Sequence, residues 1–166
     1  RSSGQDVAVK VQRPEVLENV ALDLYLMRSL APKWPEYKEM NTNLTGLVDA
    51  WGTGFINELD YREEAKATTQ FSKAMKERGL GSVFAPEVVP ELSSIHVLTT
   101  KWVDGERLVD SDANDVPRLC GVALNAYLTM MLDTGCLHCD PHPGNLLRTR
   151  DGRLCILDWG MTLDVP

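Results

Sequence analysis

The segment LHCDPHPGNLL, residues 137–147, constrains the fold most, because it places many polar side chains on one short connection between apolar elements. A helical pattern precedes it and ends at a glycine, and two strand-like runs follow it, joined by an Asp-Gly pair typical of a β-hairpin. A hairpin returns its far end towards its start, so Asp158 is expected to lie beside Asn145. Polar loops held at both ends by rigid elements often carry function.

The rest of the chain alternates between strand-like and helical patterns. Apolar residues at helical spacing mark three segments, at residues 14–30, 44–78 and 116–135. Alternating or β-rich runs mark five strands, at residues 6–12, 82–89, 94–103, 145–149 and 153–158. We expect Pro14 in the first turn of the first helix, a proline-rich break at residues 31–37, an interruption of the second helix near Gly52 and Gly54, and its end at Gly79.

Composition excludes several classes of protein. A chain of 166 residues suits a single domain with a core of its own. Its net charge of −7 argues against a general nucleic-acid binder, which needs clustered Lys and Arg. No apolar run reaches the roughly 18 residues of a membrane span, and residues 1–10 lack the pattern of a signal peptide. The four cysteines lack disulfide-framework spacing, which favours a reducing compartment.

The spacing within the polar loop has a precedent in phosphoryl transfer. Asp140 follows His138 by two residues and precedes Asn145 by five, and Asp158 begins a D-W-G at the end of the hairpin. Protein kinases carry the same order, H-R-D-L-x-x-x-N followed by D-F-G. An Asp and an Asn that converge would offer the hard oxygen ligands that Mg²⁺ prefers.

A kinase-like site also needs a lysine on a strand and a glutamate on a helix to hold it. VAVK supplies Lys10 in a strand-like run, and NELDYREEAK offers four acidic side chains on the second helix. Because a helix turns adjacent residues about a hundred degrees apart, only one of Glu63 and Glu64 can face the site, and we expect Glu64. Taken alone, Lys10 is better explained as a solvent-facing lysine on a strand edge.

Five motifs together resemble one family: VAVKVQRP, NELDYREEA, VLTTKWVDG, HCDPHPGN and LDWGM. They are similar to the UbiB/ADCK-type, or ABC1-like, atypical kinases, plastid-type members above all, and the resemblance runs from Asp6 to Met161. It implies an α+β, protein-kinase-like fold that binds ATP and Mg²⁺. It also implies a role in coenzyme Q or other prenylquinone metabolism, with a prenylquinone-type lipid or its biosynthetic enzymes as partners and peripheral membrane association. A plastid, at a plastoglobule or thylakoid, is the expected location, with the mitochondrion as the alternative.

The resemblance also assigns residues. It makes Lys10 the phosphate-contacting lysine, Glu64 its partner, Asp140 the catalytic aspartate, and Asn145 and Asp158 the metal ligands. Glu58 and Asp60 match the E-x-D of the family, which would meet an N-terminal K-x-G-Q segment. His138 and His142 belong to the loop motif, with His142 where ordinary kinases carry a lysine. The hinge that reads adenine would be Thr100, Lys101 and Trp102.

Two alternatives stay open. The K-x-G-Q segment, the phosphate-covering loop and most of the C-terminal lobe are not found, so we expect residues 1–166 to be one truncated kinase-like domain, inactive by itself. The parent protein would be a kinase or ATPase, or an inactive pseudokinase that binds a nucleotide or a partner. Cys and His are also good zinc ligands, but the C-x-H-C-x-x-H run lacks the second pair that structural zinc sites show, which leaves zinc as a remote alternative. Its residues are Cys136, His138, Cys139 and His142.

Overall fold

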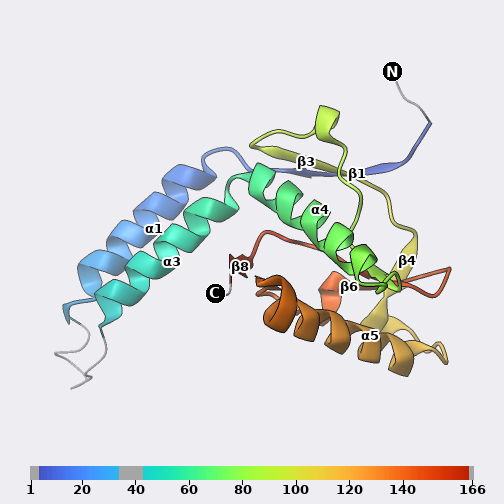
Figure 1. The fold of residues 1–166 in the computed structure, drawn as a ribbon. Helices are drawn as coiled ribbons and strands as arrows, with labels where there is room; N and C mark the ends of the chain where they lie inside the picture. Colours follow the sequence, from blue (N-terminus) through green and yellow to red (C-terminus); the bar gives the residue numbers. More distant parts are fainter. Residues whose placement is uncertain (1–3, 34–42, 165–166) are drawn as a thin grey trace.

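The computed structural model describes residues 4–33 and 43–164, and it is a mixed α+β fold (Figure 1). The main helices are α1 (Val16–Leu30), α3 (Leu44–Glu58), α4 (Tyr61–Glu77) and α5 (Val116–Thr129), and a π-helical turn continues α5 through Met130–Thr134. The strands are β1 (Val7–Val11), β2 (Val83–Phe84), β3 (Val97–Lys101), β4 (Gly105–Arg107), β5 (Cys136–His138), β6 (Leu146–Thr149), β7 (Leu154–Ile156) and β8 (Thr162–Asp164). Single 3₁₀ turns lie at Pro90–Leu92, Leu108–Asp110 and Pro143–Asn145.

The strands form three small sheets within the described part of the chain. β1 pairs antiparallel with β3, with Lys10 opposite Leu98. A second sheet has the order β2-β7-β6-β4, in which β2 runs parallel to β7 and the other pairs are antiparallel. β5 pairs antiparallel with β8, so the start of the polar loop lies beside the segment that follows D-W-G.

The core lies between α4, α5 and the β2-β7-β6-β4 sheet. α4 buries one face at helical spacing, formed by Glu64, Ala67, Thr68, Phe71 and Met75. All three residues of β7 are 0 % exposed, which places the hairpin at the centre of the core. The predicted β6–β7 hairpin is therefore confirmed, and burial of its apolar residues fixes its register.

α1 and α3 form a helical pair that projects from this body (Figure 1). No residue of α1 is buried, although the helix is rich in leucine. The expected interruption at Gly52 and Gly54 is wrong, because α3 continues through both glycines. A side chain at Gly52 would meet Leu24 of α1 at 3.2 Å, so the glycine permits the close approach of the two helices.

Other helices begin or end at positions that differ in part from those expected from the sequence. The second helical pattern breaks at Leu59 and Asp60, between α3 and α4, rather than at the glycines. Pro14 lies just before the N-cap of α1 rather than in its first turn. Gly79 ends α4 as predicted: it has a φ of +73°, and the next N–H bonds back to the carbonyl of Met75. Most of the predicted proline-rich break lies outside the described residues.

The strands β2 and β3 belong to different sheets. β2 and β3 do not pair with each other, since β2 joins β7 and β3 joins β1.

Among the helices of residues 4–33 and 43–164, none has the length and hydropathy needed to cross a bilayer.

Candidate active site

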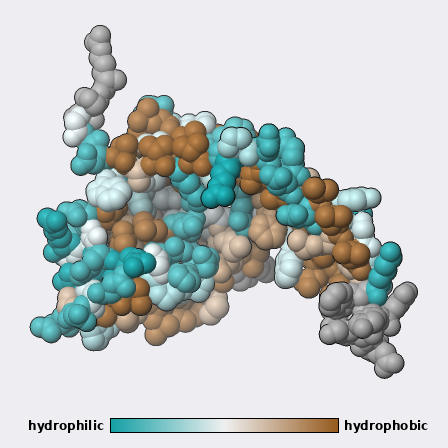
Figure 2. All heavy atoms as spheres, turned by 180° about the vertical axis from the view of Figure 1, so that it is seen from behind, coloured by the Kyte–Doolittle hydropathy of each residue, from teal (hydrophilic) through white to brown (hydrophobic). Residues whose placement is uncertain are grey.

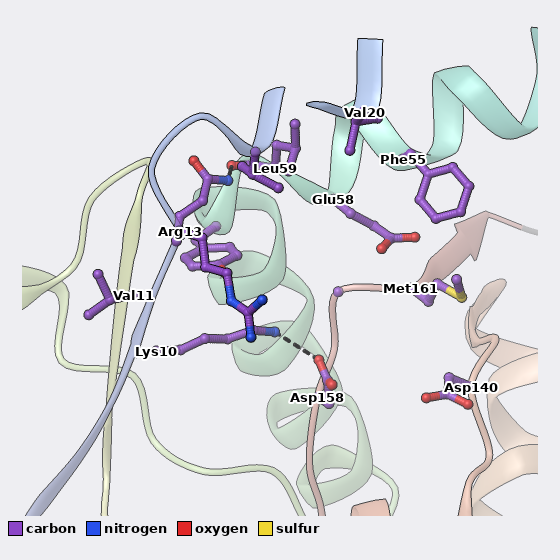
Figure 3. Close-up of a pocket in the computed structure, with 14 residues that line it drawn as sticks. Lys10, Val11, Arg13, Val20, Phe55, Glu58, Leu59, Asp140, Asp158 and Met161 are labelled. Atoms are coloured by element: carbon purple, nitrogen blue, oxygen red, sulfur yellow. Dashed lines mark hydrogen bonds and ion pairs between the residues drawn. The ribbon is translucent and has the colours of Figure 1, made fainter. Parts of the chain in front are cut away.

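A cavity of about 530 Å³ lies between β1, the C-terminal end of α3 and the polar loop (Figure 3). Its charged lining comes from segments far apart in the sequence: Lys10, Arg13, Glu58, Asp140 and Asp158. Val20, Phe55 and Met161 add apolar surface on the side of the α1–α3 pair. The fold thus gathers the lysine strand, the polar loop and the D-W-G segment around one space.

Lys10 binds two carboxylates at once. Its Nζ lies 2.9 Å from Oε2 of Glu64 and 2.9 Å from Oδ1 of Asp158. Glu64 is buried in the inner face of α4, whereas Lys10 and Asp158 remain about half exposed. The side chain of Lys10 therefore joins β1 to both α4 and the D-W-G segment.

The expectation about the two adjacent glutamates is confirmed. Glu64 contacts Lys10, whereas Glu63 lies on the exposed face of α4 and pairs with Lys66 at 2.6 Å. Helical geometry explains the difference, since neighbouring side chains on a helix point in different directions.

The pKa values of this group follow from burial and charge. Burial lowers the pKa of Lys10, but its bonds to Glu64 and Asp158 outweigh this effect and raise the pKa above its ordinary value. Burial raises the pKa of Glu64, and Lys10 offsets only part of that rise. Burial also raises the pKa of Asp158, yet the contacts with Lys10 outweigh it and leave the pKa below its ordinary value. Lys10 and Asp158 are therefore both charged at neutral pH.

The polar loop is held by its own side chains. Asn145 donates from Nδ2 to Oδ2 of Asp140 at 3.0 Å, which ties the two predicted site residues together. The N–H of Leu157 donates to the carbonyl of Asn145 at 2.8 Å. The hairpin therefore returns the residue before Asp158 to Asn145, as its pattern predicted.

The two loop histidines have different surroundings. His142 is exposed, and its Nδ1 accepts the N–H of Gly144, so it caps the 3₁₀ turn at Pro143–Asn145. His138 is 1 % exposed; its Nδ1 accepts the N–H of Asp140 and its Nε2 lies 3.2 Å from the carbonyl of Leu157. The imidazole of His138 thus connects the backbone of Asp140 to the backbone that precedes Asp158.

Trp159 anchors the D-W-G segment by packing against two other rings. Trp159 is 2 % exposed, and its ring lies 4.3 Å from Phe71 of α4 and 4.8 Å from His138, between ring centroids. Sequence analysis missed Phe71, although its position seven residues after Glu64 on one helix face was a usable signal. Asp158, next to Trp159, has a φ of +56°, a strained conformation for a residue other than glycine and one that is concentrated at functional sites.

The two residues of the E-x-D motif do not act alike. Glu58 lines the cavity, and its pKa is raised by burial and by the negative charge of Asp158. Asp60 caps α4 by accepting the N–H of Arg62 at 3.0 Å. The Arg62 guanidinium also binds this carboxylate and lowers the pKa of Asp60 to about 2.

The predicted hinge residues stand apart from the cavity. Thr100, Lys101 and Trp102 lie at the end of β3 and are not part of the cavity lining. The N–H groups of Lys101 and Trp102 already donate to the carbonyls of Glu87 and Asp6. Lys101 also forms an ion pair with Glu87.

The residues of the zinc alternative do not assemble into a metal site. Within the part of the chain that the structure describes, no three His, Cys, Asp or Glu side chains gather as a candidate metal cluster. His138 has both ring nitrogens engaged with the backbone, as described above, and Cys139 is exposed.

A magnesium ion, by contrast, suits the chemistry of the donors. The Asn145 side chain uses its amide nitrogen towards Asp140, which leaves the amide oxygen available as a ligand. Asp158 presents a charged carboxylate that is about half exposed. Carboxylate and amide oxygens of this kind, few in number, are typical of magnesium bound together with phosphates.

The profile of the ABC1 atypical kinase-like domain matches residues 1–166. This chain belongs to that family. An uncharacterized aarF domain-containing protein kinase, chloroplastic, from Arabidopsis thaliana is 40 % identical over 164 residues, which cover 99 % of this chain and 23 % of the relative. Protein ACTIVITY OF BC1 COMPLEX KINASE 3, chloroplastic, from the same plant is 37 % identical, over 100 % of this chain and 24 % of the relative.

Proteins of other organisms are similar as well. An uncharacterized protein of Synechocystis sp. is 37 % identical over 96 % of this chain and 29 % of its own length. The structure of the Rv3197–erythromycin complex from Mycobacterium tuberculosis superimposes with a TM-score of 0.78 and 28 % identity, covering 99 % of this chain and 42 % of that one. The chain therefore spans about a quarter of the curated relatives it matches, and the ABC1 kinase-like fold predicted from its motifs is confirmed.

Proposed function

We propose that this ABC1 domain binds ATP with Mg²⁺ in the cavity between Lys10 and Asp140 and promotes transfer of the terminal phosphoryl group, as an atypical kinase or as an ATPase. The observation that carries the proposal is the contact of Lys10 with both Glu64 and Asp158, across 54 and 148 positions of sequence. Such convergence of a lysine, a helical glutamate and a metal-binding aspartate is what phosphoryl transfer requires.

Each residue has a distinct part in this proposal. Lys10, held by Glu64, steadies phosphate oxygens, and Asp140, fixed by Asn145 and by the His138 contact to its backbone, orients the attacking hydroxyl or water. Mg²⁺ held by Asn145 and Asp158 would neutralise the phosphate charge. Most of the rate acceleration then comes from positioning and from charge stabilisation in a preorganised site.

The test compares nucleotide binding by the protein at its natural full length with and without Mg²⁺. Asp158→Asn should weaken Mg²⁺-dependent binding far more than metal-free binding, because the amide keeps the shape of the side chain and loses its charge. Equal losses in both conditions would make Asp158 a structural residue. Binding without any turnover would instead favour the pseudokinase alternative.

We further propose a role in prenylquinone metabolism within a plastid, with a prenylquinone-type lipid or its biosynthetic enzymes as partners. The support is the family membership and the names of the Arabidopsis relatives, which are chloroplastic. Fractionation of cells that express the tagged full-length protein tests the location, and recovery with mitochondria would contradict it. Turnover measured with and without prenylquinone precursors tests the pathway.

A further inference from the structure

Arg13 lines the cavity beside Lys10, and the motifs of the sequence assign it no role. Its side chain comes from the segment just after β1, and its guanidinium points to the same side of the cavity as the amine of Lys10 (Figure 3). The cavity thus receives two cationic side chains from one stretch of chain.

The guanidinium of Arg13 has no protein partner within residues 4–33 and 43–164. The other arginines of this part of the chain each pair with a carboxylate, namely Arg28, Arg62, Arg78, Arg107, Arg118, Arg148, Arg150 and Arg153. Arg13 makes no such pair, although Glu58, Asp140 and Asp158 line the same cavity. An arginine that faces a cavity and leaves its five donors unused is well suited to an anionic ligand.

The backbone that carries Arg13 is fixed on both sides. The side-chain amide of Gln12 makes two contacts: its Nε2 donates to the carbonyl of Leu59 at 2.9 Å, and its Oε1 lies 2.6 Å from Nδ1 of His96. Pro14 follows directly and restricts Arg13 to an extended backbone. The guanidinium therefore extends into the cavity from a backbone that is already held in place, which reduces the entropy lost when a ligand binds.

The charge of the cavity explains why a second cation is useful. Lys10 divides its charge between Glu64 and Asp158, and Glu58 and Asp140 add two further carboxylates. A phosphate chain that enters such a space meets repulsion from these groups. Arg13 has no carboxylate to satisfy, so its charge is available in full to the ligand.

We propose that Arg13 is a second phosphate-binding side chain, which contacts the polyphosphate chain of the nucleotide next to Lys10. This inference rests on the proposed function and adds a specificity to it. Arginine binds phosphate oxygens through two parallel hydrogen bonds, so its contribution grows with the number of phosphates within reach. The site should accordingly prefer ATP to ADP and ADP to AMP, and it should bind inorganic tripolyphosphate by itself.

The experiment measures dissociation constants of the full-length protein, with Mg²⁺, for ATP, ADP, AMP and inorganic tripolyphosphate. Arg13→Gln should weaken ATP and tripolyphosphate on the order of tenfold, the effect expected from one lost charge-assisted hydrogen-bond pair, and should leave AMP nearly unchanged. Arg13→Lys should restore part of the loss, because it keeps the charge without the fork. Arg150→Gln, which replaces an exposed arginine outside the cavity lining, is the control and should bind as the wild type does.

The outcomes separate this inference from the proposed function. If Arg13→Gln binds ATP normally while Lys10→Gln does not, Arg13 has no phosphate role and the proposed function stands. If the wild type binds neither ATP nor tripolyphosphate, the proposed function fails together with the inference. An equal loss of affinity for AMP and for ATP overturns the assignment of Arg13 to the polyphosphate chain. Equal thermal unfolding of the wild type and Arg13→Gln confirms that the fold is intact.

Discussion

The two walls of the cavity are built in different ways. The wall that carries Asp158 rests on the core, where Leu154 and Ile156 are 0 % exposed and Trp159 is 2 % exposed. The wall that carries Lys10 is a two-stranded sheet in which Val9 is 55 % and Val11 is 64 % exposed. Close packing therefore fixes the first wall, whereas β1 in the second wall depends more on polar contacts.

This difference assigns a physical task to each wall. The packed wall holds the loop and Asp158 in register, because His138 and Trp159 cannot shift without disturbing the core. The exposed wall depends on Lys10 and Gln12, whose bonds to Glu64 and Leu59 attach it to the helices. We expect variants of the packed wall to affect turnover and folding, and variants of the exposed wall to affect ligand binding.

The apolar surface of the exposed side extends beyond the cavity. Seen from behind, the α1–α3 pair carries several hydrophobic patches on its surface (Figure 2). The exposed apolar and aromatic side chains of the pair include Leu22, Tyr25, Leu26, Leu30, Trp51 and Phe55, each between 42 % and 68 % exposed. The pair therefore adds little to the core that supports the packed wall.

The largest effect should come from Asp140 in the packed wall. Asp140→Asn should reduce phosphoryl transfer or ATP hydrolysis by about 10²–10⁴-fold, the usual contribution of a positioned general base. The affinity for ATP should stay within about threefold, because the asparagine keeps the contact with Asn145. Steady-state kinetics with a parallel binding titration measure both quantities. If Asp140→Asn instead lost affinity for ATP and kept its turnover rate, the packed wall would serve ligand binding rather than turnover.

The second prediction compares the stability of the walls directly. Trp159→Ala should lower the free energy of unfolding by about 3–5 kcal/mol, because it opens a cavity between Phe71 and His138. Val9→Ala in β1 should cost less than about 1 kcal/mol, since the side chain is already more than half exposed. Urea unfolding of the two variants gives both values. Similar losses of unfolding free energy in the two variants would show that the side chain of Val9 is buried in solution rather than exposed.

The packed wall was also the more predictable of the two from sequence. The apolar run of β7, the Asp-Gly turn and the spacing of Asp140, Asn145 and Asp158 gave the hairpin and its polar ends, because periodicity and turn chemistry are local signals. Family resemblance and helical geometry together gave Glu64 as the partner of Lys10. The contact between Lys10 and Asp158 was not predicted, since it depends on how two distant segments approach each other.

Tertiary packing explains the predictions that failed. The glycines of α3 suggested a break, but close packing of Gly52 on Leu24 outweighs a helix propensity cost of about 1 kcal/mol per glycine. Phe71 and Arg13 were missed because one side chain functions through contacts made in three dimensions and the other through a contact it lacks. Helical spacing from Glu64 marks the buried position of Phe71 but not its contact with Trp159, and nothing in the local sequence marks the missing partner of Arg13.

The third prediction concerns the ion pair that joins the walls. Glu64→Gln should weaken ATP binding about tenfold, because Lys10 loses a charge-assisted bond and then depends on Asp158 alone. Glu63→Gln is the matched control: it is the neighbouring glutamate, lies on the exposed face and should change affinity less than about twofold. Isothermal titration of both variants with ATP and Mg²⁺ distinguishes them. Equal effects would mean that Lys10 does not need its helical partner.

The smallest effect should come from Asp60, where α4 begins beside the exposed wall. Asp60→Ala should lower the free energy of unfolding by about 1 kcal/mol through loss of the helix cap, whereas Asp60→Asn should cost less, since asparagine also caps helices.

The pH dependence of Asp60 separates its cap from its charge. The folded pKa of about 2 lies below the ordinary value of 3.8, because Arg62 binds the carboxylate, so the ionised form favours folding. The stability that the charge provides is therefore complete above pH 3.8 and is lost as the pH falls towards 2. The difference between the wild type and Asp60→Asn, measured by thermal unfolding, should accordingly vanish over this interval. A difference that does not change between neutral pH and pH 2 would show that the ionised carboxylate gains no stability from Arg62, and that α4 is held at its start by the cap alone.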